Sequence, residues 1–151
     1  MSLEQQIEQD LKAALLAGDA QRVSVLRGLK SVLLNEKIAR GSRDSGLSDD
    51  ATLSIISKES KKRQDSADLY KQGGAQDKAN AELEEKAIID SYLPAQLSED
   101  EIAQLVDQAI AVTGASGPAD MGKVIGAVRA KAGASADGGV IARITKEKLG
   151  L

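Results

Sequence analysis

The residue types that most often carry out catalysis are missing from this chain. It contains no Cys and no His, which excludes thiolate nucleophiles, His general bases and Cys/His zinc sites. The stretch from Gly117 to Lys123 has the glycine–lysine spacing of a phosphate-binding P-loop, but Val124 stands where that loop needs Ser or Thr. We therefore predict no catalytic residue, no metal site and no cofactor, and we do not expect the protein to be an enzyme on its own.

Two carboxylates at helical spacing are a weaker candidate for chemistry. Glu82 and Glu85 are three residues apart and would share one face of a helix. Such a pair could hold a cation. The interpretation that we favour is a solvated acidic face, or pairing with basic neighbours.

Binding has better support near the C-terminus, where two glycines and several basic residues share one segment. Gly122 and Gly126 are four residues apart and lie on one face of the predicted helix. They either pack tightly against the last helix or let an RNA phosphate approach closely, with Lys123 beside them to supply charge. The basic residues that could complete this surface are Arg129, Lys131, Arg143, Lys146 and Lys148.

A second candidate surface lies in the N-terminal half. Its members are Arg27, Lys30, Lys58, Lys61, Lys62 and Arg63. Between Lys12 and Arg63 the net charge is +5, whereas it is −7 between Asp65 and Glu101 and +4 between Lys123 and Lys148, although the whole chain is only −3. These basic residues could bind nucleic acid, or they could pair within the chain with Glu59, Asp65 and the acidic segment that follows.

These residues must be positioned by helices, because apolar residues recur at helical spacing along the chain. Aromatic residues are limited to Tyr70 and Tyr92, so the core must consist of Leu, Ile, Val and Ala. In the long third helix we expect Leu53, Ile56, Leu69 and Tyr70 to face the core. The seven predicted helices span about residues 3–17, 19–39, 48–72, 76–91, 99–113, 117–133 and 137–149.

A break divides the predicted helices into two groups. Pro94 cannot continue a helix and biases Leu93 toward an extended backbone. Ser98 and Glu101 then form a capping box that begins the next helix. We predict an all-α protein with a four-helix N-terminal subdomain over residues 1–94 and a three-helix C-terminal subdomain over residues 95–151.

Several segments together resemble the GatB/YqeY family. The strongest matches are residues 92–102, which begin Tyr-Leu-Pro, then residues 116–126, which contain Gly122 and Gly126, and the Ala-Asp-Gly of residues 136–138. Residues 26–31 and 61–66 look like the N-terminal motifs of the family. The resemblance runs through nearly the whole chain in the same order.

The resemblance implies a function in translation. A related module is the appendage of the B subunit of the tRNA-dependent amidotransferase, where it helps to hold the tRNA. We therefore expect a non-catalytic accessory module that binds tRNA or another folded RNA, without sequence readout of DNA. Alternatives are a component of a carbon–nitrogen ligase with glutamine as amido donor, and an adaptor for a protein partner of the translation machinery.

The expected location follows from the apolar pattern. The N-terminus lacks the layout of a signal peptide, and no apolar run in the sequence is long enough to span a membrane. We expect a cytoplasmic protein that makes no membrane contact.

Overall fold

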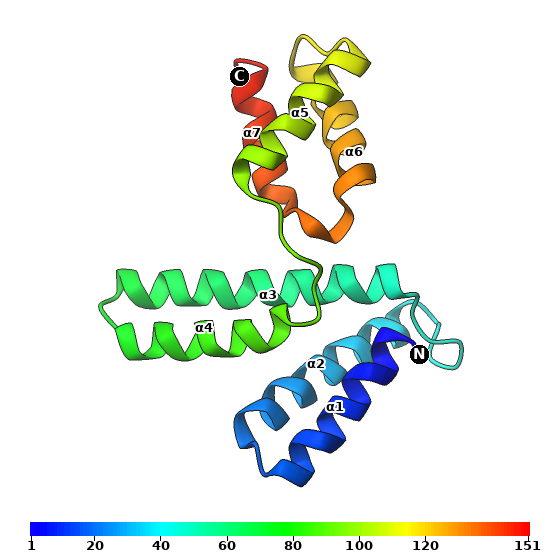
Figure 1. Cartoon of the computed structure of the whole chain (residues 1–151), viewed down its shortest axis with the longest axis vertical. Helices are drawn as coiled ribbons and strands as arrows, with labels where there is room; N and C mark the ends of the chain where they lie inside the picture. The colour runs from blue at the N-terminus through cyan, green and yellow to red at the C-terminus, as the bar shows by residue number, and fades with distance from the viewer. The chain divides into compact units, whose positions relative to one another are not determined.

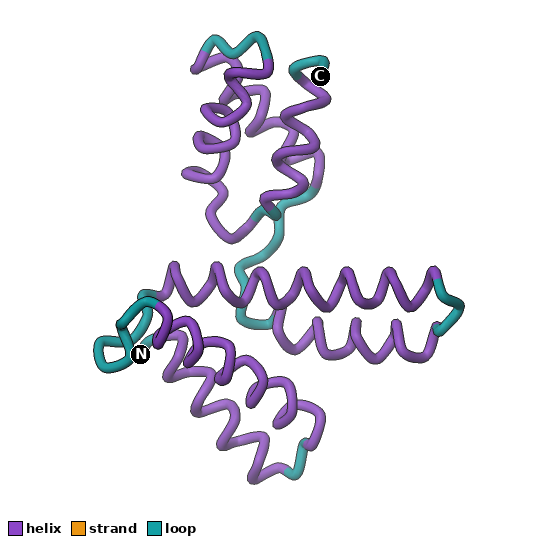
Figure 2. The backbone as a smooth tube through the Cα atoms, turned by 180° about the vertical axis from the view of Figure 1, so that it is seen from behind, coloured by secondary structure: helices purple, strands orange, loops and turns teal.

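The computed structural model describes residues 1–151, and every regular element in it is helical (Figure 2). The prediction of an all-α protein with seven α-helices is confirmed. No helix is both long and apolar enough to cross a membrane. The helices are α1 (Leu3–Ala17), α2 (Ala20–Ala39), α3 (Asp49–Gln72), α4 (Gln76–Asp90), α5 (Glu99–Thr113), α6 (Met121–Ala132) and α7 (Gly138–Lys148).

Local capping explains where several of these helices begin and end. Ser2 and Ser98 each form a capping box, in which the Ser hydroxyl accepts a hydrogen bond from the third helical backbone N–H. Gly18 and Gly114 end α1 and α5 in the left-handed conformation that glycine adopts without a steric cost. These short-range signals are visible in the sequence, so the predicted helix limits lie close to the observed ones.

The chain divides into two compact units, Met1–Leu93 and Pro94–Leu151. In the first unit α1 and α2 form one helical hairpin, and α3 and α4 form another (Figure 1). Its main apolar core contains residues from all four helices, among them Ile7 of α1, Leu26 of α2, Ile56 of α3 and Ile89 of α4. Tyr92, just after α4, also belongs to this core.

The distal half of the α3–α4 hairpin is built differently from the sequence prediction. Leu69 is 67% exposed and Tyr70 is also exposed, so the prediction that both face the core is wrong. Ala67 and Ala79 are the fully buried residues here, and small side chains let two helices approach closely. The Tyr70 ring lies instead under the ammonium group of Lys78, 5.8 Å from its centroid.

In the second unit each of the three helices packs against the other two. The buried residues come from one stripe on each helix, for example Val106 of α5, Val124 of α6 and Ile141 of α7. The sequence predicts that the sixth helix begins near residue 117, but residues Pro118–Asp120 form a 3₁₀ turn and α6 begins at Met121. The backbone N–H of Leu97 donates to Ser135 O at 2.7 Å, which ties the segment before α5 to this unit.

Candidate nucleic-acid interface

The two glycines of α6 face open space. A Cβ atom added at Gly122 or at Gly126 would have no neighbouring atom within 4 Å, and both residues are exposed. The buried residues Val124 and Val128 occupy the opposite side of the helix. The interpretation that these glycines pack against the last helix is therefore wrong, and no contact within the unit requires either of them.

Arg129 extends the same exposed face by one turn of α6, because it follows Gly126 by three residues. Its guanidinium lies against the first residue of α7, where Nη2 would be only 2.5 Å from a Cβ atom at Gly138. A larger residue at Gly138 would push this side chain aside. Asp137 caps α7 by accepting a hydrogen bond from the backbone N–H of Val140 at 3.1 Å.

The other basic residues of this unit fall into two groups. Arg143 pairs with Glu99 and, at 3.2 Å, with Glu147, while Lys148 pairs with Asp107 at 3.2 Å. Four others are exposed and form no ion pair: Lys123, Arg129, Lys131 and Lys146. Of the basic residues predicted for this surface, Arg143 and Lys148 are already paired with carboxylates of their own unit.

One carboxylate lies close to Lys123 in the chain. The Asp120 side chain accepts a hydrogen bond from the backbone N–H of Ser116 at 3.0 Å. This bond, with a smaller contribution from the charge of Lys123, lowers the pKa of Asp120 below its ordinary value. Asp120 is therefore charged at neutral pH and offsets part of the positive field of Lys123.

In the first unit, Arg63 lies between the two carboxylates that the sequence offered as a cation site. Its guanidinium pairs with Glu82 at 3.2 Å and also with Glu85. Pairing with a basic neighbour is thus the interpretation that the structure supports for Glu82 and Glu85. No group of three or more acidic side chains in the chain is arranged to hold a metal ion.

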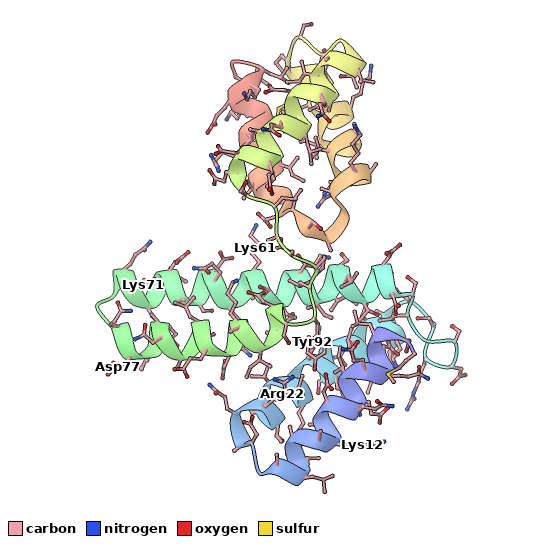
Figure 3. The ribbon with its side chains drawn as sticks, viewed as in Figure 1. Lys12, Arg22, Lys61, Lys71, Asp77 and Tyr92 are labelled. Atoms are coloured by element: carbon pink, nitrogen blue, oxygen red, sulfur yellow. The ribbon has the colours of Figure 1, made fainter.

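The remaining basic residues of the N-terminal set differ in whether they form an ion pair. Lys30 pairs with Glu8 at 3.4 Å and Lys62 with Glu59 at 2.8 Å. Arg27 and Lys61 form no ion pair. Figure 3 shows Lys61 on the side of α3 that points away from α4, whereas Arg27 lines a groove between α1 and α2.

A buried polar contact in the first unit was missed by the sequence reasoning. The hydroxyl of Tyr92 donates to Asp10 Oδ2 at 2.6 Å, and Arg22 lies close by (Figure 3). Burial first, and the hydrogen bond to Asp10 second, raise the pKa of Tyr92 far above its ordinary value of 10.0. Asp10 and Tyr92 are 82 residues apart, so no local pattern could have joined them.

A known protein family matches nearly the whole chain. No curated protein matches the chain. The family model described as Yqey-like protein matches residues 4–149, which include both units and every residue of the candidate interface. The chain therefore belongs to the family of Yqey-like proteins.

Proposed function

We propose that this protein is a non-catalytic accessory module that binds the backbone of a folded RNA, such as tRNA, through α6 and α7. Membership of the Yqey-like family supports a module similar to the appendage of the amidotransferase B subunit. The observation that carries the RNA proposal is the exposed glycine face of α6, with the unpaired Lys123 and Arg129 beside it. We further propose that residues 1–94 and 95–151 are separate subdomains and that the protein acts in the cytoplasm.

The two glycines weaken the helix that contains them. A glycine inside a helix destabilises it by about 0.5–1 kcal/mol relative to alanine. Nothing inside the unit touches the Cβ positions of Gly122 and Gly126, so packing within the unit does not explain them. A partner backbone that must come close to the helix axis would explain them.

Charge favours a phosphate backbone as that partner. Lys123 and Arg129 lie on α6 beside the glycines, and Lys146 lies on α7; all three lack a carboxylate partner. Phosphate contacts of this kind position a protein on a nucleic acid without reading its sequence. The chain has only two aromatic residues, which argues against stacking on single-stranded bases.

A tRNA titration of two matched glycine variants tests the proposal. Gly126→Leu and Gly28→Leu both replace an exposed glycine in a helix interior, and neither Cβ position has a neighbour within 4 Å. Both substitutions should stabilise the protein slightly, because leucine is a better helix former. Only Gly126→Leu should weaken tRNA binding in fluorescence anisotropy at low salt.

Charge reversal provides an independent readout. Each phosphate contact contributes about 0.9 to the slope of log K against log salt concentration, so Lys146→Glu should reduce that slope by about this amount or more. Lys12→Glu, an equal charge change on an exposed position of α1, should leave it unchanged. Absence of tRNA binding by the unaltered protein, or equal losses in both variants, would contradict the proposal.

A further inference from the structure

The outer side of the α1–α2 hairpin contains a groove that the RNA proposal does not use. Two adjoining cavities form it, one of about 670 Å³ and one of about 440 Å³. Leu11 and Leu34 line the larger cavity, and Leu15 and Val23 line the smaller one. Arg27 lines both, so it lies where the two cavities meet.

Exposed leucines from both helices line the groove. On α2 the groove residues Arg27, Ser31 and Leu34 are four and three residues apart and so lie on one face. Ile38 continues this face beyond the residues that line the groove. Leu34 is 41% and Ile38 54% exposed, and Leu15 of α1 is 49% exposed. Apolar side chains gathered along a groove are typical of a surface that binds another protein.

The charges of the groove leave one cation without a partner. Lys30 pairs with Glu8 at 3.4 Å, and Lys37 pairs with Glu4 at 3.2 Å, so two ion pairs join α1 to α2 across it. Arg27 forms neither an ion pair nor a side-chain hydrogen bond. A ligand with apolar side chains on both sides of a carboxylate would complement these residues.

We propose that this groove binds an amphipathic helix of a partner protein, with an Asp or Glu in its central turn that pairs with Arg27. Apolar side chains at i, i+3 or i+4 and i+7 of that helix would contact Leu34 and Leu15 on either side of Arg27. The groove residues of α2 run from Ser24 to Lys37, a distance of about 20 Å at 1.5 Å per residue. The bound helix is therefore about 14 residues long.

The same observations disfavour RNA as the ligand of this groove. Leucine side chains offer no donors to phosphate oxygens, and both lysines of the groove are engaged by glutamates. A bidentate arginine–carboxylate pair in a partly apolar site matches the residues present.

The test is a selection of displayed helical peptides, about 14 residues long, on the whole protein, with the Leu34→Ser variant used to remove peptides that bind elsewhere. The enriched peptides should carry an acidic residue flanked by apolar residues at helical spacing. Arg27→Glu should weaken their binding about tenfold or more, and replacing the acidic residue of the peptide by Lys should restore binding to this variant. Leu69→Ser, at an exposed leucine of α3, is the matched control and should have no effect.

Four results would overturn the proposal. The first is no enrichment on the whole protein over Leu34→Ser, and the second is peptides that bind Arg27→Glu as tightly as the unaltered protein. The third is that tRNA displaces the peptides and that Arg27→Glu also binds tRNA more weakly. The groove would then be part of the RNA interface. The fourth is a dimer of the unaltered protein that Leu34→Ser converts to a monomer, because a second copy of the chain would then fill the groove.

Discussion

Replacing Tyr92 by Phe removes a single hydroxyl from the junction between α4 and the α1–α2 hairpin. That hydroxyl donates to Asp10 Oδ2 at 2.6 Å, and the ring is almost fully buried. A hydrogen bond to a charged acceptor contributes about 1.5–3 kcal/mol to stability. We expect Tyr92→Phe to lower the free energy of unfolding by this amount, with the apolar packing of the ring retained.

Urea denaturation followed by far-ultraviolet circular dichroism measures this loss. For a slope of about 1–3 kcal/mol per molar urea, the unfolding midpoint should fall by roughly 1 M. Tyr70→Phe is the matched control, because Tyr70 is the only other tyrosine and its hydroxyl makes no hydrogen bond. A loss below about 0.5 kcal/mol in Tyr92→Phe, or equal losses in both variants, would refute the reasoning.

The same contact predicts a dependence on alkaline pH. In Tyr70→Phe the only tyrosine left is Tyr92, and its absorbance should titrate above its ordinary pKa of 10.0. Because the unfolded chain releases this proton first, the folded state binds more protons above pH 10, so stability falls as the pH rises. The contribution of Tyr92 is therefore complete below pH 10 and is lost above it. Titration at or below 10.0 would show that the hydroxyl is neither buried nor bonded as described.

Three further predictions concern two buried threonine hydroxyls, a buried alanine of α3, and the second unit on its own. Thr145→Val should raise stability by about 1 kcal/mol, because the buried hydroxyl of Thr145 has no hydrogen-bond partner; Thr52→Val should lower it by a similar amount, because Thr52 Oγ1 donates to Ser48 O at 3.0 Å. Urea unfolding of the two variants checks both signs. Ala67→Leu should cost about 1–3 kcal/mol by overpacking the buried contact between α3 and α4, whereas Ala13→Leu, at an exposed position of α1, should cost almost nothing. Residues 95–151 expressed alone should unfold cooperatively, since they contain their own core; a gradual, featureless thermal transition would contradict this.

The helices could be predicted from the sequence because their signals are short in range. A capping box such as Ser98 with Glu101, or a glycine end such as Gly18, involves residues within one turn of each other. The buried residues of the second unit also recur at helical spacing, as Ile102, Val106 and Ala109 do in α5.

The face of α3 was harder to predict. Its length of 24 residues exceeds that of its partner α4, with 15, and its central part is mostly polar. Periodicity indicates which residues share a face but not which face meets a neighbour. Leu69 and Tyr70 were therefore placed inside, although the small residues Ala67 and Ala79 are the ones buried there.

The candidate sites depend on pairs that are distant in the sequence. The sequence allowed both an ion-paired and a free Arg63, and only the tertiary structure brings it between Glu82 and Glu85. Likewise, the spacing of Gly122 and Gly126 fits either a packed or an open face. Only the packing of the three helices of the unit shows that both glycines have open surroundings.

The distal half of the α3–α4 hairpin buries only alanines. This should determine how protection from hydrogen exchange varies along α3. Burial of an alanine methyl group contributes only about 0.8 kcal/mol, and Ala67 and Ala79 stand outside the main apolar core. The turn around Gly73 and Gly74 should therefore open locally many times for each global unfolding event. Backbone amides near Ile56 should exchange slowest in α3, and those toward Gln72 progressively faster, so that one continuous helix contains both long-lived and short-lived hydrogen bonds.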